Sequence, residues 1–258
     1  MSAHDLEVAI QAAKAASAIH QAARGSDLKV STKSTAIDLV TRVDTESEEA
    51  IRSILLAAFP GDGILGEEGG ERNGETGRRW LVDPLDGTLN YAHGFPWYCV
   101  SIALEVDGDL QVAVVLDSAH DELFHARRGH GAWLGDQRLC VSSRDRLDQS
   151  MVATGFAYRP EWMAENVATF ARMMPKVRAI RRPGAAALDL ASLAAGRLDG
   201  FWEIHLNPWD VAAGVLLIEE AGGRVSGPGG LKHELGDKTL VASNGPIHED
   251  LLAALQLE

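Results

Sequence analysis

Cysteine is scarce in this chain of 258 residues, which contains only Cys99 and Cys140. Both lie in segments with a strand-like pattern, and their spacing is not that of a metal site. We therefore expect two buried thiols in a reducing compartment, with a disulfide between them as the weaker alternative.

Long apolar runs are also missing. No stretch approaches the roughly 20 apolar residues that cross a bilayer. The first ten residues, MSAHDLEVAI, lack the basic and apolar regions of a secretory signal. We accordingly predict a cytoplasmic protein with no membrane partner.

Positive charge is in deficit, with 24 lysines and arginines against 37 acidic residues and a net charge of −13 at neutral pH. A nucleic-acid surface needs an excess of positive charge, so we predict no nucleic-acid partner. A small phosphorylated substrate is still possible, because bound metal ions can reverse the local sign. The chain also lacks a G-x-x-x-x-G-K-[ST] loop, which argues against a magnesium-dependent kinase or nucleotide hydrolase.

The remaining composition, 46% hydrophobic and 24% charged, is typical of a globular protein. Apolar residues recur at helical spacing in residues 5–23. They recur again after Thr45, which has the spacing of a capping box with Glu48, in a helix that should stop at residue 60. A short strand over 63–66 precedes the glycine-rich, charged stretch 69–78, which we expect to be a mobile surface loop.

The pattern of the chain changes at about residue 145. Before it, RWLVD (79–83) and the segments of 98–141 alternate like the strands of an antiparallel meander. After it, strands and helices alternate. We predict an α+β fold with an N-terminal lobe, residues 1–145, that contains an antiparallel sheet and most of the site residues discussed below. A mixed α/β lobe, residues 146–258, would complete the site.

Two carboxylates stand almost side by side in WLVDPLDGTLNYAHG (80–94), where Asp83 and Asp86 follow a predicted strand. Like charges this close repel unless a positive charge lies between them. Mg²⁺ prefers oxygen ligands and takes a few carboxylates together with water and phosphate oxygens. Acids also stand at other element boundaries, namely Asp44, Glu67 and Asp210. The sequence therefore predicts a divalent metal site.

Gly87 and Thr88 follow the two acids directly. If a helix begins there, its unpaired N–H groups form an anion site next to the metal. Carboxylates for metal beside amides for phosphate indicate phosphoryl transfer or hydrolysis of a phosphate ester. Each feature alone is also explained by a helix cap or a solvated turn. Their joint occurrence with the adjacent acids Glu67 and Glu68 favours a functional site.

Three motifs carry a resemblance to the inositol monophosphatase family: GEE at 66–68, WLVDPLDGTLNYAHGFP at 80–96 and FWEIHLNPWDVAAG at 201–214. Weaker similarity extends through KSTAIDLVTRVD at 33–44, RRGHGAWLG at 127–135 and RRPGAAALDL at 181–190. The resemblance implies a five-layer αβαβα sandwich of the inositol monophosphatase and fructose-1,6-bisphosphatase type. It also implies Mg²⁺-dependent hydrolysis of a small phosphate monoester, inhibition by lithium, and a homodimer.

The resemblance further implies which residues hold two to three Mg²⁺ ions. A first ion would be held by Glu67, Asp83 and the carbonyl of Leu85, and a second by Asp83, Asp86 and Asp210. A third, weaker ion would rest on Glu67, with Lys33 as a contributor.

Roles in catalysis and substrate binding are implied in the same way. Catalytic roles are implied for Glu67 and for Thr88 paired with Asp44, which would orient the attacking water. Substrate contacts are implied for Asp86, Gly87, Thr88, Gly184, Ala186 and Glu203. No cysteine or histidine is placed as a nucleophile.

Two positions depart from the family pattern. Ala185 stands where many relatives have serine or threonine, and His205 stands where a glycine is common. Both lie on the side of the substrate alcohol, so they affect the expected substrate and leave the expected chemistry intact. We expect the other histidines in turns or at the surface, and Trp202 and Trp209 as core or packing aromatics.

The leading interpretation is hydrolysis of myo-inositol 1-phosphate to inositol and phosphate. The alternatives are a phosphatase for fructose 1,6-bisphosphate, histidinol phosphate or NADP, and a non-catalytic interaction protein on the same scaffold. Such an interaction protein should have lost metal ligands, whereas all the expected acids are present.

Overall fold

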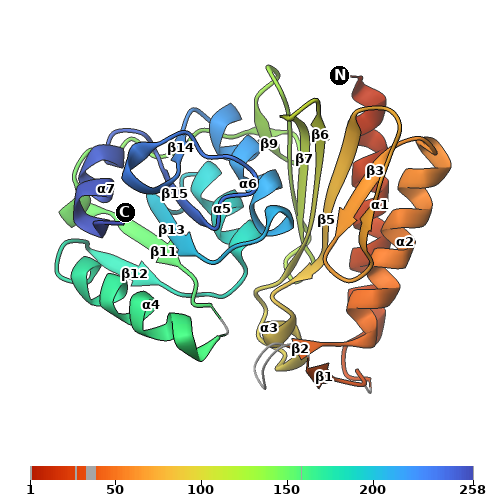
Figure 1. Cartoon of the computed structure of the whole chain (residues 1–258), viewed down its shortest axis with the longest axis horizontal. Helices are drawn as coiled ribbons and strands as arrows, with labels where there is room; N and C mark the ends of the chain where they lie inside the picture. The colour runs from red at the N-terminus through yellow and green to blue at the C-terminus, as the bar shows by residue number, and fades with distance from the viewer. Residues whose placement is uncertain (1, 27, 33–38, 158, 258) are drawn as a thin grey trace.

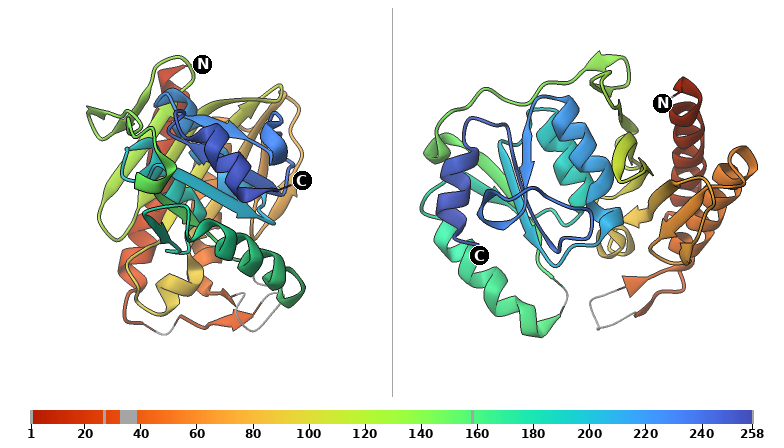
Figure 2. Two further views of the ribbon diagram at one scale, coloured as in Figure 1. Left: turned by 90° about the vertical axis from the view of Figure 1, so that its left-hand side faces the viewer. Right: turned by 45° about the horizontal axis from the view of Figure 1, so that its top comes forward.

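Five layers in the order αβαβα make up the fold, as the resemblance implied (Figure 1). The computed structural model describes residues 2–26, 28–32, 39–157 and 159–257. Helices α1 (Ala3–Ala23) and α2 (Arg42–Ala58) form one outer layer, and α4 (Pro160–Met173) and α7 (His248–Leu255) form the other. Between the two sheets lie α5 (Ala186–Ala194) and α6 (Pro208–Glu220), and Figure 2 shows the layers from two further sides.

The first sheet has eight strands in the order β10-β9-β8-β7-β6-β5-β3-β4. Its strands are β3 (Gly63–Gly66), β4 (Gly70–Arg72), β5 (Arg78–Asp86), β6 (Cys99–Val106), β7 (Asp109–Asp117), β8 (Glu122–Arg127), β9 (Ala132–Leu134) and β10 (Gln137–Arg138). All neighbours are antiparallel except β3 and β5. The predicted meander after residue 98 is therefore present as β6 to β10.

The second sheet has five strands in the order β12-β11-β13-β15-β14. Its strands are β11 (Met151–Thr154), β12 (Ala179–Arg181), β13 (Gly200–Ile204), β14 (Arg224–Ser226) and β15 (Thr239–Ser243). Short elements complete the fold: the pair β1 (Ser31–Thr32) and β2 (Leu39–Val40), the helix α3 (Thr88–Ala92), and two 3₁₀ turns, Leu147–Gln149 and Pro228–Gly230.

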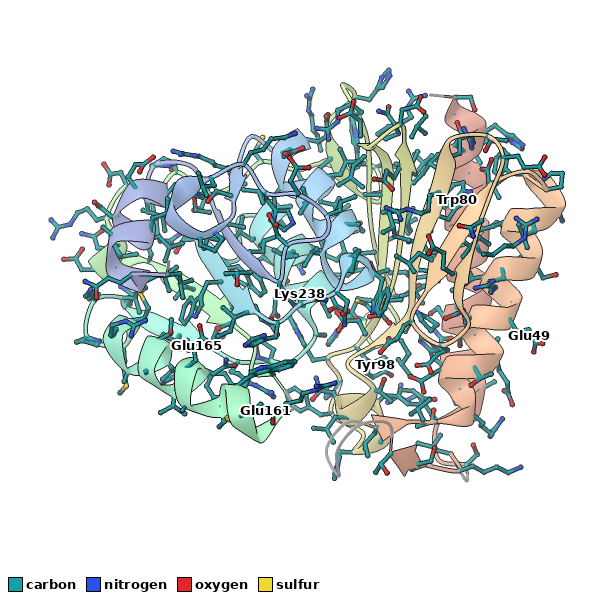
Figure 3. The ribbon with its side chains drawn as sticks, in the orientation of Figure 1. Glu49, Trp80, Tyr98, Glu161, Glu165 and Lys238 are labelled. Carbon is teal, nitrogen blue, oxygen red and sulfur yellow. The ribbon has the colours of Figure 1, made fainter. Side chains whose placement is uncertain are left out.

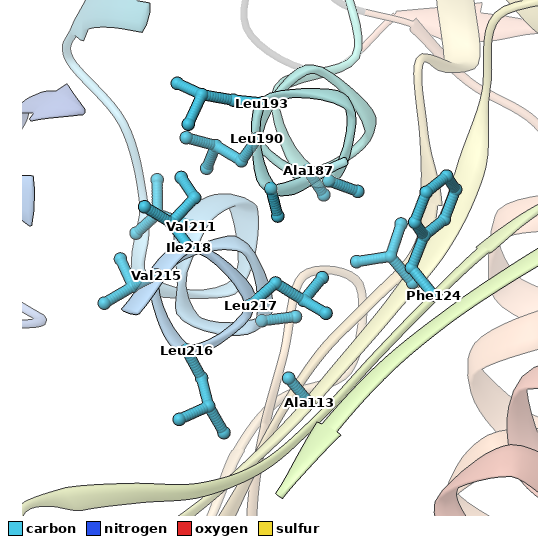
Figure 4. Packing of buried hydrophobic residues seen from close by; sticks show 14 of the residues in the cluster. Ala113, Phe124, Ala187, Leu190, Leu193, Val211, Val215, Leu216, Leu217 and Ile218 are labelled. Atoms are coloured by element: carbon cyan, nitrogen blue, oxygen red, sulfur yellow. The ribbon is translucent and has the colours of Figure 1, made fainter. Parts of the chain in front are cut away.

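The middle helices join the two sheets through one core. Residues of α5 and α6 pack in a single buried cluster with Phe124 of β8, Phe201 of β13 and Leu240 of β15. Figure 4 shows the two helices packed against each other and toward the eight-stranded sheet. This core includes side chains of both sheets. The division of the chain into lobes 1–145 and 146–258 stays a prediction.

The outer helix α1 packs through alanines on the eight-stranded sheet. Ala9, Ala12, Ala13 and Ala16 are fully buried in one cluster with Trp80 of β5. Small side chains let the helix axis approach the sheet closely, and they lose no side-chain entropy on burial.

Several local predictions were wrong. Helix α2 begins three residues before Thr45, with Thr41 as its cap and Asp44 as the partner in the capping box. The helix begins earlier because the Thr41 hydroxyl accepts a hydrogen bond from the Val43 amide. Glu48 instead accepts the amide of Glu68, in the turn after β3.

The stretch 69–78 is also not a loop throughout. Residues Gly70–Arg72 pair with β3 as the edge strand β4. Greater mobility of the rest of the stretch stays a prediction. Neither cysteine is in a disulfide, and Cys99 is buried as expected, but Cys140 is exposed.

Two histidines expected in turns or at the surface are fully buried instead. His20 lies on α1 and His248 at the start of α7, and each ring nitrogen of both side chains has a polar partner. Hydrogen bonding of both nitrogens removes most of the cost of burying a neutral imidazole. No helix in the described part of the chain is long and apolar enough to cross a membrane.

Candidate active site

A cavity of about 520 Å³ opens between the two lobes, and most of the predicted site residues line it. Its lining includes Glu67, Asp83, Leu85, Asp86, Gly87, Thr88, Gly184, Ala185, Ala186, Glu203, His205, Trp209 and Asp210. A pocket of this size is in the range that holds small ligands. Lys33 lies outside the described residues.

The carboxylates Asp83 and Asp86 occupy an irregular end of β5. The strand continues to Asp86, past the predicted end at Asp83, but its pairing with β6 is interrupted between these two residues. Pro84 has no N–H for the ladder, and the Leu85 amide turns to donate to Asp83 Oδ1 at 3.0 Å. The interruption turns both carboxylates toward the cavity.

Gly87 ends this strand with a left-handed conformation, at φ +90°. A Cβ atom at this position would lie 2.8 Å from the carbonyl oxygen of Trp97 and 3.3 Å from the Ala185 side chain. Glycine is therefore required both by the backbone conformation and by the space. Helix α3 begins at the next residue, Thr88, so the first N–H groups of this short helix have no partner within it.

His20 contacts the turn at Pro84 through a hydrogen bond, and this role was not predicted from the sequence. Its Nε2 lies 3.0 Å from the carbonyl oxygen of Pro84 and its Nδ1 lies 2.9 Å from Ser118 Oγ. A carbonyl oxygen can only accept, so Nε2 carries the hydrogen and Nδ1 accepts from the Ser118 hydroxyl. Burial lowers the pKa of His20 to about 4, which keeps the ring neutral.

Glu48 fixes the neighbouring turn, which carries Glu67. Its two carboxylate oxygens accept the amides of Glu68 and Gly69 at 2.7 and 2.8 Å, and Arg52 pairs with it at 3.2 Å. The Glu67 amide in turn donates to the carbonyl oxygen of Val82. Glu48, which was predicted as the partner of Thr45 in a capping box, therefore fixes the loop that follows β3.

Asp44 and Thr88 meet across the lobe, in the pairing that the resemblance implied. Thr88 Oγ1 lies 2.7 Å from Asp44 Oδ1 and 3.0 Å from the carbonyl oxygen of Leu85. The other carboxylate oxygen, Oδ2, accepts from both the amide and the hydroxyl of Thr41. Asp44 is fully buried and caps α2, so the fold of the helix start fixes its orientation toward Thr88.

Asp86 and Asp210 are held by helix starts of the middle layer. Asp86 Oδ2 accepts the Ala187 amide at 2.7 Å, and the amide of Ala186 also bonds to this carboxyl. Asp210 Oδ2 accepts the Asn207 amide at 2.6 Å in the capping box of α6. The N–H of Ala186, which was expected to face the substrate, is thus directed at Asp86.

The acids at this end of the cavity disturb one another. Burial, followed by the charges of Glu67, Asp86 and Asp210, raises the pKa of Asp83 well above its usual range. Burial is also the largest cause of the raised pKa values of Asp86 and Asp210. Several carboxyls gathered in a buried place keep protons unless a cation replaces them.

This donor set fits a hard divalent cation. The acids contribute only oxygen ligands, and the carbonyl of Leu85 lies in the same lining. Among the described residues, however, no three acidic, histidine or cysteine side chains are already arranged as a metal cage. Mg²⁺ does not need one, because it keeps several waters and takes substrate oxygens.

The opposite side of the cavity carries Glu203 of β13. A Cβ atom on Gly155 would overlap its carboxylate group, so a side chain at that position would displace the acid from its place. Burial, and then the charge of Asp86, raises the pKa of Glu203 to about 8, while Arg182 opposes the shift. Asp189, a second acid missed from the sequence, is buried nearby and accepts the Trp97 indole N–H at 3.0 Å.

His205, the departure from glycine noted above, has a left-handed backbone with φ +69°. That conformation explains why glycine suits this position. The imidazole stacks on Trp162 of α4 with ring centroids 3.8 Å apart and planes 9° apart, and Glu165 lies 3.5 Å from its Nε2. The stack joins the turn after β13 to α4 and adds an aromatic wall to the cavity, and Figure 3 labels Glu165.

Two tryptophans were expected as core or packing aromatics. Trp202 is buried, with 2% of its surface exposed, as predicted. Trp209 is only half-buried and lines the cavity, beside Asp210. Its position at the start of α6, one residue before Asp210, could have indicated from the sequence that Trp209 lines the cavity.

Comparison with known proteins gives consistent results. A sequence model described as "Inositol monophosphatase family" matches residues 2–258. The chain is 44% identical over 221 residues to an inositol-1-monophosphatase of Mesorhizobium japonicum, covering 85% of this chain and 83% of that protein. It is 42% identical to the Nus factor SuhB of Pseudomonas aeruginosa, covering 97% and 95% of the two chains. Among solved structures, the extragenic suppressor protein suhB from Bartonella henselae is similar, with a TM-score of 0.94, 41% identity and coverage of 98% and 99%.

Proposed function

The chain belongs to the inositol monophosphatase family, and on that premise we propose that it hydrolyses a small phosphate monoester, with myo-inositol 1-phosphate as the leading substrate. The single observation that carries the proposal is the cavity in which four acids, Glu67, Asp83, Asp86 and Asp210, lie with Thr88. Fructose 1,6-bisphosphate, histidinol phosphate and NADP stay alternative substrates.

Two to three Mg²⁺ ions would be held by the four acids and the Leu85 carbonyl, where they would polarise the phosphoryl oxygens, lower the pKa of water and stabilise the leaving oxygen. The raised pKa values of these carboxyls support this assignment, because they indicate that no positive charge among the described residues compensates the buried acids.

The residues of the chain would do the following. Thr88 Oγ1 gives its hydrogen to Asp44 Oδ1, so that a lone pair of the Thr88 oxygen can accept a hydrogen from water in the pocket. As the water oxygen bonds to phosphorus, the bond from phosphorus to the ester oxygen breaks and the alcohol leaves, taking up a proton from solvent. The proton of the attacking water can pass to Thr88 Oγ1 while that hydroxyl passes its own to Asp44. The first amides of α3, at Gly87 and Thr88, would bind phosphate oxygens.

Glu203 would recognise the alcohol half of the substrate. Arg182 and bound metal ions would favour the ionised form of this carboxyl, and the carboxylate can accept hydrogen bonds from two neighbouring hydroxyls. Ala185 contributes no hydroxyl, and the Gly184 carbonyl already accepts from Asn90. We therefore propose a tolerant enzyme whose alcohol selectivity rests mainly on Glu203.

A second candidate function is an interaction protein on the same scaffold. The relative of Pseudomonas aeruginosa named Nus factor SuhB supports it. The proposal of an enzyme is supported by the presence in one cavity of every acid that was expected to bind metal.

Release of inorganic phosphate from a panel of polyol, sugar and nucleotide phosphates tests the proposed activity. We expect turnover with Mg²⁺, loss of turnover on chelation, and inhibition by lithium near Asp210. Full activity after exhaustive chelation would refute metal dependence. No release from any ester of the panel would favour the interaction protein. A cytoplasmic homodimer is part of the same proposal, and sedimentation would test the dimer.

A further inference from the structure

The cavity has a second, chemically different end, formed by positive side chains. Arg159, Arg182 and Lys238 line it together with Phe156 and Trp162, whereas the interacting acids Glu67, Asp83, Asp86 and Asp210 form the other end. All three basic side chains are on exposed residues, and Figure 3 labels Lys238. In a chain with a net charge of −13, three cations around one cavity are an unexpected concentration.

The two arginines are held by aromatic rings. The guanidinium carbon of Arg182 lies 5.5 Å from the ring centre of Phe156, and that of Arg159 lies 5.0 Å from the ring centre of Trp162. Trp162 is itself fixed by its stack on His205. Arginine over a ring keeps its planar fork in place, and the N–H donors at the edge of the fork stay available.

Within the described residues, the guanidiniums of Arg159 and Arg182 make no hydrogen bond and no ion pair. Other arginines do pair with carboxylates: Arg42, Arg52, Arg78, Arg79, Arg128, Arg144, Arg146, Arg197 and Arg224. Arg182 is near enough to Glu203 and Asp189 to affect them, but neither carboxylate is within ion-pair distance. Lys238 donates to Asn207 Oδ1, a neutral partner, at 3.1 Å. The positive charges at this end are therefore not neutralised by the protein.

We propose that this end of the cavity is a subsite for a second anionic group, a carboxylate or a second phosphate, on the alcohol half of the substrate. The inference rests on the proposed phosphatase function and names its substrate class. Arg182, next to Glu203, is the main contact, and Arg159 and Lys238 complete the subsite. Guanidinium groups bind carboxylate and phosphate through paired, charge-assisted hydrogen bonds.

A set of three substrates with one carbon skeleton tests the subsite. Glucitol 6-phosphate has a neutral far end, 6-phosphogluconate has a carboxylate there, and glucitol 1,6-bisphosphate has a phosphate. We expect kcat/KM to be about tenfold or more higher for the two anionic compounds, the effect of one charge-assisted contact. The difference between the carboxylate and the phosphate identifies which anion the subsite prefers.

Arg182→Gln should reduce the anionic-to-neutral ratio of kcat/KM to within about threefold of one, and Arg159→Gln should reduce it by a smaller factor. Arg181→Gln is the matched control, because Arg181 is the exposed neighbour that does not line the cavity. Among the described residues, its side chain bonds only to the Ile180 carbonyl. That variant should keep the wild-type ratio. General electrostatic attraction of anions would instead lower the ratio by a similar factor in Arg181→Gln and Arg182→Gln, because each variant removes one positive charge.

Calorimetric binding of the same three compounds separates this proposal from the proposed function. Tighter binding of the anionic compounds that depends on Arg182, without hydrolysis of any of them, would keep the subsite and refute the phosphatase. Hydrolysis of glucitol 6-phosphate with no preference for an anionic end would keep the phosphatase and overturn the subsite. A ratio unchanged by Arg182→Gln would also overturn it.

Discussion

The two ends of the cavity hold their charges in different ways. At the acidic end, Asp44, Asp83, Asp86 and Asp210 each accept a backbone amide, and helix starts or strand irregularities fix their positions. At the basic end, arginines rest on aromatic rings, and exposed residues carry the charges.

The two ends therefore differ in how tightly their charged groups are held in position. Backbone amides hold a carboxylate within a narrow geometry, which suits groups that must share metal ions and a reacting phosphate. Arginines on aromatic rings have a fixed plane but, within the described part of the chain, no hydrogen bond that fixes their position, which suits recognition of groups that differ from one substrate to another. We therefore expect the acidic end to control kcat and the other end to control the choice among substrates.

The largest expected effect is at Asp83. Asp83→Asn should lower kcat by several orders of magnitude, because this carboxyl would serve both proposed metal sites. The amide oxygen can still accept from Leu85, and removing a buried carboxyl from a group of like charges should not destabilise the metal-free fold. Phosphate release and thermal melting without metal check both parts. A melting temperature that falls along with the activity would mean that Asp83 supports the fold.

Thr88 should come next. Thr88→Ala removes the hydroxyl between Asp44 and the pocket and should lower kcat about 100-fold, at the lower limit of proton-transfer catalysis. Thr88→Ser keeps the hydroxyl and should recover activity to within about tenfold of the wild type. Single-turnover kinetics measure the chemical step directly. Equal losses in the alanine and serine variants would contradict a role for the hydroxyl.

At the other end, Glu203→Gln should lower kcat/KM for inositol 1-phosphate by about tenfold, through the loss of one or two charge-assisted hydrogen bonds. Hydrolysis of a phosphate ester without neighbouring hydroxyls should hardly change. Assays of both esters with the same variant make the comparison. Similar losses on both esters would mean that Glu203 helps to hold the metal ions and does not recognise the alcohol.

The last comparison concerns stability below neutral pH. The pKa values of His20 and His248 are both lowered from 6.5 to about 4, chiefly by burial. Between these values the unfolded chain binds a proton that the folded chain does not, so the free energy of unfolding falls as the pH falls from 6.5 to 4. For one such histidine the limit is about 3 kcal/mol. Urea unfolding of His20→Gln and His248→Gln at pH 4.5 and 7.5 should give a smaller difference than the wild type.

These two variants also form a matched pair for the comparison of the lobes. His20 bonds to the Pro84 carbonyl beside Asp83, whereas His248 bonds to Ser226 and Ser243 of the second sheet. Activity at pH 7.5 should fall in His20→Gln and stay at the wild-type level in His248→Gln. Unchanged activity in both would show that His20 does not position the turn.

Local signals in the sequence determined most of the elements and the acidic end. Apolar periodicity gave α1, the meander and the alternation after residue 145, because burial of one face has a fixed period in helices and strands. The dense motif around Asp83 and Asp86 marked the site, since proline, glycine and acids follow each other within a few positions. The start of α2 was placed wrongly because Thr41 and Thr45 both have a suitable acid three residues later.

Only the tertiary structure decided the partners that are distant in the chain. His20 reaches Pro84, Glu48 reaches the turn after β3, and Arg182 reaches Phe156, although no local pattern relates these pairs. A buried histidine and a surface histidine look alike in sequence, and an arginine over a ring looks like any other. Such contacts depend on how sheets and helices stack around a common core, and that stacking is set by side-chain packing over the whole chain. The grouping of the acids was therefore readable from the sequence, and the basic end of the same cavity was not.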